Sequence, residues 1–172
     1  MSPRVLCLVS FLVLSLLWGC AAPVQVIKEP PVRLEGFMSS KWGASPEEVK
    51  KAVEQDGIKW FQDHTGETPY TLYASGTYLD HSAIFSYFFT PKTKKLYRVD
   101  VTFNDLRAYE KGKGHLFQTF KTPSFSQKDL DHWSWLDRSL LILQKDQTHV
   151  QISFSNGDLL LLNQKEREGT SR

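Results

Sequence analysis

Apolar residues first recur at helical spacing shortly after position 45. Val49, Ala52 and Val53 follow the i, i+3, i+4 pattern and would form one apolar stripe on a helix. Gly57 can adopt the left-handed conformation that commonly ends a helix. We therefore expect a helix over residues 46–56, with its apolar stripe against the core.

The residues before this stripe are typical of a helix N-terminus. Ser45 suits the N-cap, and Pro46 suits the first helical position, where a missing N–H costs nothing. Glu48 lies three residues after Ser45 and can close a capping box. Glu47 and Glu48 also complement the positive end of the helix dipole.

A strand-rich block follows, in which apolar and polar residues alternate. We expect strands over 71–75, 82–90 and 95–103, with the polar turn 91–94 joining the last two as a hairpin. One face of the third strand carries large apolar side chains and should face the core: Tyr97, Val99, Val101 and Phe103.

Residues 105–120 are expected to form a second helical region. Gly112 and Gly114 weaken its middle by about 1 kcal/mol each relative to alanine. The helix is therefore expected either to span the whole region or to begin only near Lys111, after a broken turn.

The last third again reads as β structure. Short apolar segments predict strands over 133–135, 139–144, 148–154 and 158–163. Asn156-Gly157 lies between two apolar runs and is typical of a two-residue type I′ hairpin turn. Residues 166–172 are polar and are expected to form a frayed tail.

The order of elements predicts an α+β fold. Antiparallel hairpins with grouped helices favour a two-layer structure, a sheet with the helices on one face. The order is a helix and three strands, then a helix and three or four strands, so the single domain, residues 41–165, divides into two pseudo-repeats of helix and three strands, 41–104 and 105–165.

Residues 1–19 have the pattern of a secretory signal. A basic start is followed by an apolar run of thirteen residues over 5–17. This run is shorter than the roughly 20 apolar residues of a membrane-spanning helix. Two other interpretations are a signal cut after Ala22 and an uncleaved membrane anchor.

Leu17-Trp18-Gly19-Cys20 resembles the lipobox of bacterial lipoproteins. The resemblance implies that Cys20 becomes the mature N-terminus and carries acyl chains that anchor the protein in the membrane. The residue after the cysteine is not Asp, and in this the sequence resembles lipoproteins of the outer-membrane class. The resemblance implies an outer-membrane protein that faces the periplasm. The segment after Cys20, residues 20–40, contains three prolines and is expected to be an extended tether, or in part, over 32–37, an edge strand.

Charge and cysteine content exclude several functions. The chain has 21 basic and 19 acidic residues, and loss of Arg4 with the signal leaves a formal charge of about +1. Such a balance provides no basic field for nucleic acid. Cys7 leaves with the signal and Cys20 would be acylated, so the mature domain has no thiol for a disulfide or a metal site.

No motif for catalysis, nucleotide binding or metal binding is present. We expect the histidines and three aspartates to lie apart on loop or strand-end surfaces, unable to activate one another: His64, His81, His115, His132, His149, Asp63, Asp80 and Asp131.

Two features could bind a ligand but also have ordinary structural explanations. The basic turn 111–114 could contact a phosphate or be a solvated loop. A group of aromatic residues could form a ligand surface or simply pack in and around the sheet: Tyr70, Tyr73, Tyr78, Trp133 and Trp135.

Residues 43–49, Gly-Ala-Ser-Pro-Glu-Glu-Val, resemble the opening helix of small envelope domains of the BamE/SmpA and β-lactamase-inhibitor-protein type. The segment is also similar to small bacterial lipoproteins that open with WG-x-S-x-E-E-V-K. The resemblance implies an opening helix followed by an antiparallel meander after a lipidated cysteine. Asp56-Gly57-Ile58-Lys59 stands where the BamE type has Gly-x-Pro.

These observations lead to two hypotheses of function. The first is a non-catalytic envelope lipoprotein that holds a protein partner on its sheet face or helix layer. The second is a periplasm-facing binder of a small or lipidic ligand. Neither requires a cofactor, and in both the membrane is contacted through Cys20.

Overall fold

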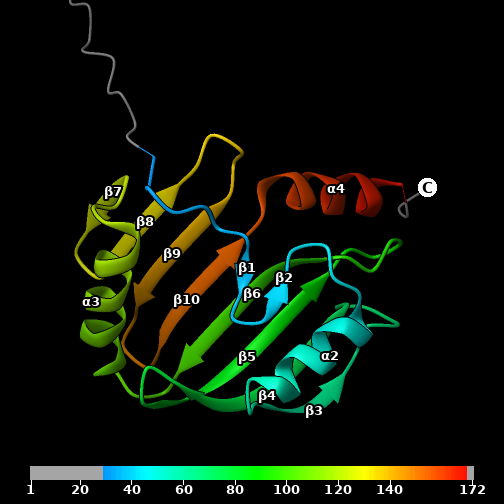
Figure 1. Ribbon diagram of the computed structural model, residues 1–172, viewed down its shortest axis with the longest axis horizontal. Helices are drawn as coiled ribbons and strands as arrows, with labels where there is room; N and C mark the ends of the chain where they lie inside the picture. The colour runs from blue at the N-terminus through cyan, green and yellow to red at the C-terminus, as the bar shows by residue number, and fades with distance from the viewer. Residues whose placement is uncertain (1–28, 170–172) are drawn as a thin grey trace, which may run out of the picture.

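In the described part of the chain, eight antiparallel strands form one sheet in the order β3-β4-β5-β6-β10-β9-β8-β7, and three helices pack on it (Figure 1). The computed structural model describes residues 29–169. The strands are β1 (Gly36–Phe37), β2 (Ser40–Lys41), β3 (Lys59–Asp63), β4 (Thr71–Tyr78), β5 (His81–Phe89), β6 (Leu96–Phe103), β7 (Phe125–Gln127), β8 (Leu130–Ser134), β9 (Leu140–Lys145) and β10 (Val150–Ser155); the helices are α2 (Pro46–Gln55), α3 (Ala108–Phe120) and α4 (Gly157–Glu168).

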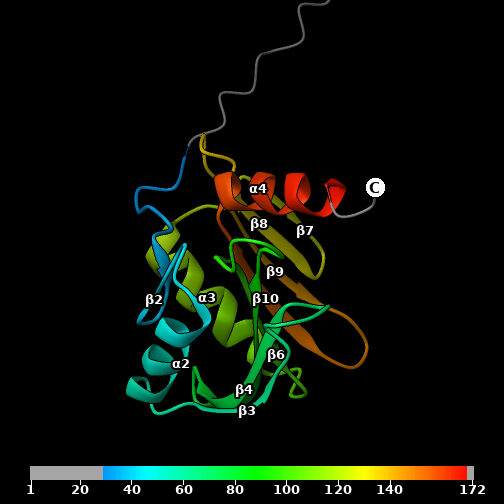
Figure 2. The same ribbon diagram turned by 90° about the vertical axis from the view of Figure 1, so that its right-hand side faces the viewer.

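The predicted α+β class is confirmed. Helices α2 and α3 lie on the same side of the sheet (Figure 2), and their apolar side chains join the inward-facing strand residues in one core. Each of these helices is followed by four strands, where three were expected after the first helix and three or four after the second. The additional strands, β3 and β7, form the two edges of the sheet, and all their residues are exposed, so they carry no strong apolar alternation.

Helix α2 has the predicted capping box. The Ser45 backbone N–H donates to the Glu48 carboxylate at 2.8 Å, and the Glu48 backbone N–H donates to Ser45 Oγ at 3.4 Å. Val49, Ala52 and Val53 are buried, as their spacing predicts. The local sequence therefore specifies this helix and the face that it buries.

The β5–β6 hairpin is confirmed, but its strand β6 begins with a bulge. Phe88 pairs with Arg98 and Phe89 pairs with Leu96, so Tyr97 is an extra residue in the ladder. Leu96 consequently joins the core, whereas Tyr97 contacts Phe88 on the opposite side of the sheet. The expected inward position of Tyr97 was therefore wrong, because a bulge shifts the side-chain alternation by one residue.

Helix α3 is continuous through its two glycines. A Cβ placed on Gly112 would lie 3.4 Å from Ile152 and 3.6 Å from Leu143, so this glycine sits where the helix approaches β9 and β10 closely. Residues 111–114, considered as a possible basic turn, are part of this helix.

The predicted hairpin at Asn156-Gly157 was wrong. Asn156 has φ −93° and caps helix α4, its side-chain oxygen accepting the Leu159 N–H at 3.0 Å. Residues 158–163 are therefore helical and not a strand. The expected frayed tail was also wrong for Glu166, which is buried within α4. Short apolar runs fit a buried strand or a helix equally well, which explains the error.

The N-terminal boundary of the folded part also differs from the prediction. Within the expected tether, Leu34 and Phe37 are buried in the core, and β1 pairs with β2 in a small separate hairpin. The Phe37 ring centroid lies 4.9 Å from that of Phe154 and 5.4 Å from that of Tyr78. Residues 29–40 are thus part of the domain. Cys20 and the predicted signal lie outside the described residues.

Candidate interaction surface

Among the helices of residues 29–169, none packs over the centre of the sheet on the side opposite α2 and α3 (Figure 2). Helix α4 crosses one end of the sheet, where β5 ends and β6 begins. We call this side the open face. Its outward side chains come from every strand, among them Phe61, Tyr73, Ile84, Ser86, Phe88, Arg98, Asp100, Thr102, Ser153, Ile142, His132 and Phe125.

An ion pair lies near the middle of the open face. Arg98 Nε and Nη2 donate to the two carboxylate oxygens of Asp100, both at 2.7 Å. Asp100 is only 5% exposed although it points away from the core, and its cross-strand neighbours are the small residues Ser86 and Ser153. The guanidinium carbon of Arg98 is 5.3 Å from the centre of the Phe88 ring. The Arg98 side chain therefore lies along the surface of the sheet, and its positive charge is paired with the negative charge of Asp100.

Aromatic side chains lie towards both edges of the open face. On one side, Phe61 is 56% exposed and stacks on Tyr73, with ring centroids 6.5 Å apart. On the other side, exposed Phe125 lies against His132 at 6.1 Å. Exposed aromatic rings together with a central arginine are typical of protein interfaces.

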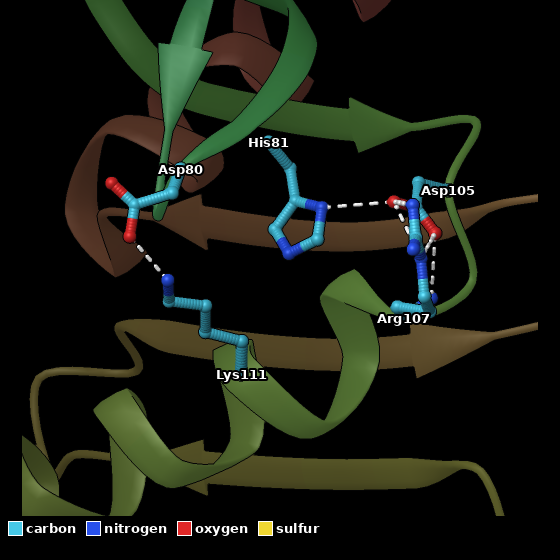
Figure 3. Close-up of polar contacts among 5 residues, drawn as sticks. All are labelled: Asp80, His81, Asp105, Arg107 and Lys111. Carbon is cyan, nitrogen blue, oxygen red and sulfur yellow. Dashed lines mark hydrogen bonds and ion pairs between the residues drawn. The ribbon is translucent and has the colours of Figure 1, made fainter.

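A polar hollow lies where the turn between β4 and β5 meets the start of α3 (Figure 3). Lys111 of α3 bonds to Asp80, and His81 Nδ1 lies 3.0 Å from Asp105 Oδ2. Arg107 donates hydrogen bonds from its Nε and Nη2 atoms to the two oxygens of the Asp105 carboxylate. Hydrogen bonds from the Arg107 guanidinium and backbone hold the pKa of Asp105 well below its ordinary value. The charged groups in this hollow are therefore already paired with one another.

The hollow depends on a turn that the sequence analysis missed. Tyr78 pairs with His81, and the two residues between them, Leu79 and Asp80, have φ values of 51° and 60°. This is a two-residue hairpin with positive φ at both central positions, the geometry expected instead at Asn156-Gly157. It brings Asp80 to Lys111 and His81 to Asp105.

The histidines and aspartates are less isolated than predicted. Besides the His81–Asp105 contact, His149 Nε2 is 3.0 Å from Asp146 Oδ2 and its Nδ1 is 3.0 Å from Thr148 Oγ1. Asp146 Oδ1 also accepts hydrogen bonds from the backbone N–H groups of Thr148 and His149. All three residues belong to one exposed turn, and these hydrogen bonds lower the pKa of Asp146. The arrangement stabilises the β9–β10 turn.

The other two predicted aspartates, Asp63 and Asp131, also have structural partners. Asp63 Oδ2 lies 2.7 Å from Lys50 Nζ. Asp131 is fully buried under α3, where it accepts a hydrogen bond from Ser126 Oγ at 2.6 Å and pairs with Lys113 Nζ at 3.0 Å.

The aromatic residues considered as a ligand surface do not come together as one surface. Trp133 and Trp135 are buried and donate their indole N–H groups to backbone carbonyls. Tyr78 packs against Phe37 on the core side, whereas Tyr73 lies on the open face. Of this set, Tyr73 alone contributes a ring to the open face described above.

Within residues 29–169, no three histidine, cysteine, aspartate or glutamate side chains gather in an arrangement that could bind a metal. Across the same part of the chain, none of the helices has the length and apolar character needed to cross a membrane. Comparison with protein-family models, curated proteins and solved structures found no match to this chain.

Proposed function

We propose that this protein is a non-catalytic interaction module, anchored through acylated Cys20 in the bacterial cell envelope, where it binds another envelope protein on its open face. The observation that carries the proposal is the composition of that face. Exposed aromatic and aliphatic groups flank a central arginine–aspartate pair on a broad sheet surface. These features match the surface chemistry of protein interfaces.

We infer further that the domain consists of two pseudo-repeats. The sheet order places β6 beside β10, so the two helix-plus-four-strand units join through their last strands. This arrangement makes one wide face from two similar halves, and it supports a flat protein partner rather than a small ligand. The alternative function is binding of a small ligand, for which the polar hollow of Figure 3 is the candidate site. The charged side chains there are already paired with one another, so this alternative has less support.

Site-specific photocrosslinking in cells tests the proposed face. A photoreactive amino acid at Ile84, exposed on the open face, should give a discrete protein adduct of the full chain. The matched control is Lys51, which is exposed on α2 over the other side of the sheet. Equal adducts from both positions, or none from Ile84 and Tyr73, would contradict the proposed face.

The anchor has a separate test. Cys20→Ala should abolish incorporation of a fatty-acid analogue and release the protein from membranes, because the acyl chains supply the membrane affinity. A variant that still carries the label would show that Cys20 is not the acylated residue.

A further inference from the structure

The loop between β8 and β9 displays a conspicuous apolar side chain. Leu136 is 84% exposed, more than any other large apolar residue in the described part of the chain. The loop itself is well fixed: Arg138 N–H donates to the Trp135 carbonyl at 2.9 Å, and Ser139 N–H donates to Asp137 at 2.9 Å. Trp135 is buried, with its ring edge against Phe120. Leu136 is therefore held in solvent by an ordered loop.

The first described residues lie against this loop. Glu29 Oε1 accepts the Leu136 N–H at 2.5 Å, and the Val32 carbonyl accepts the Trp135 indole N–H at 3.0 Å. Val32 is itself 46% exposed. Two segments about a hundred positions apart in the sequence thus meet at one site, where Val32 and Leu136 are both exposed. We call residues 29–33 and 135–139 together the Leu136 tip.

Chain length ties the Leu136 tip to the membrane. Glu29 is nine residues after Cys20, which at about 3.3–3.6 Å per residue spans roughly 30 Å at full extension. The predicted tether was about twice as long, and it would have left the orientation of the domain open. Because residues 29–40 are packed on the domain, the acylated cysteine would hold the Leu136 tip near the lipid surface.

The surroundings of the Leu136 tip suit such a surface. Arg33 and Arg138 are exposed residues of the Leu136 tip and could reach lipid phosphates. The acidic groups of the Leu136 tip, Glu29 and Asp137, are also exposed, and each accepts a backbone N–H. Helix α4 begins at the same end, where Gly157 packs against the backbone of residues 137 and 138.

We propose that the Leu136 tip docks on the lipid bilayer, with Leu136 inserted at the boundary between headgroups and acyl chains. This proposal rests on the proposed anchor at Cys20. A weak apolar contact beside a covalent anchor adds a second attachment point and so restricts rotation about the first. Strands β8, β9 and β10 end or begin at the Leu136 tip, so the sheet would stand upright and leave its open face accessible to a protein partner.

Fluorescence quenching on the full, membrane-inserted protein tests the proposal. Leu136→Cys is labelled with an environment-sensitive dye, and the processed protein is reconstituted into phosphatidylethanolamine–phosphatidylglycerol vesicles that contain brominated lipids. Phe61→Cys, exposed on the distant edge strand β3, is the matched control. We expect a blue shift and strong quenching of the dye at position 136, and neither change at position 61.

Mass spectrometry of the same samples separates this proposal from the anchor itself. Acylated protein whose dye at position 136 behaves as in water would overturn the docking of the Leu136 tip while leaving the anchor intact. Quenching at position 136 in protein without acyl chains would support the docking and refute the anchor. Equal quenching at positions 61 and 136 would also overturn the proposed orientation.

Discussion

Glu166 of α4 accepts two hydrogen bonds from Thr93, which lies 73 positions earlier in the chain. The Thr93 hydroxyl donates to Glu166 Oε1 at 2.6 Å, and the Thr93 backbone N–H donates to Oε2 at 3.1 Å. The Lys92 N–H donates to the same Oε2 at 2.6 Å. The buried carboxylate therefore fastens α4 across the β5–β6 turn.

We expect Glu166→Ala to destabilise the protein by about 1–3 kcal/mol, because backbone N–H groups in a partly buried turn would lose their acceptor. Urea unfolding monitored by tryptophan fluorescence measures this change. Glu168→Ala is the control, since Glu168 is exposed on the same helix. Equal midpoints for the two variants would show that Glu166 does not hold α4 in place.

A second prediction concerns acid stability. Burial alone would raise the pKa of Asp63, but hydrogen bonds from Lys50 and Thr65 outweigh it and lower that pKa from 3.8 to about 2. The Asp63–Lys50 pair therefore stabilises the fold fully above the ordinary pKa, and this contribution disappears as the pH falls through about 2. Because the pair is partly exposed, we expect about 1 kcal/mol or less.

Unfolding free energies of wild type and Asp63→Asn, measured from neutral pH down to strong acid, check this sign. The difference between the two proteins should be largest near neutrality and should shrink as the pH falls below 3.8. Glu35→Gln, which changes an exposed carboxylate, is the control. A difference that grows in acid would contradict the assigned direction of the pKa shift.

Gly157 and Gly114 should respond to alanine in opposite ways. A Cβ on Gly157 would lie 2.1 Å from the Asp137 carbonyl oxygen, so Gly157→Ala should cost more than about 1 kcal/mol through overpacking against backbone. Nothing lies within 4 Å of a Cβ on Gly114, and Gly114→Ala should stabilise α3 by up to about 1 kcal/mol. Thermal unfolding of the two variants distinguishes these outcomes; a stabilising Gly157→Ala would contradict the close approach.

The capping box at α2 yields a smaller effect. Ser45→Ala removes two hydrogen bonds of the Ser45 hydroxyl, the 3.4 Å bond from the Glu48 N–H and the 2.8 Å bond to the Glu48 carboxylate, but leaves the Ser45 backbone bond to Glu48 in place. Because these groups are exposed, we expect a loss of about 0.5–1 kcal/mol, in the lower part of the range for N-cap substitutions. Denaturant midpoints measure it, with Ser39→Ala as a comparison outside the helix. A loss above about 2 kcal/mol would indicate a further role for the Ser45 hydroxyl.

Local signals in the sequence correctly predicted those elements whose cause is itself local. The Ser45 hydroxyl and the Glu48 carboxylate accept backbone N–H groups at the start of α2, and Pro46 has no N–H to satisfy, so neighbouring residues suffice to define this helix. The alternating strand β6 and the polar turn 91–94 predicted the central hairpin for the same reason. Which side of the sheet has no helix over it, by contrast, could not be predicted from the sequence. A serine at an outward-facing strand position is compatible both with a helix packed over it and with solvent.

Two sites, Asn156-Gly157 and Leu79-Asp80, show most clearly that tertiary contacts, and not local composition, determine where a hairpin turn forms. Asn156-Gly157 has the favoured turn composition, yet Asn156 caps a helix, and Gly157 is required by the backbone of residues 137 and 138 that packs against it. Leu79-Asp80 has no such composition, yet the long β4–β5 pairing, from Thr71 opposite Phe88 to Tyr78 opposite His81, imposes positive φ on both residues. The sequence by itself determined the helix α2, the central strands and most of the apolar positions that they bury, and it predicts the anchor at Cys20. Contacts between distant segments decided the helix α4, the packing of residues 29–40 and the open face, because their energies depend on neighbours that only the folded chain brings together.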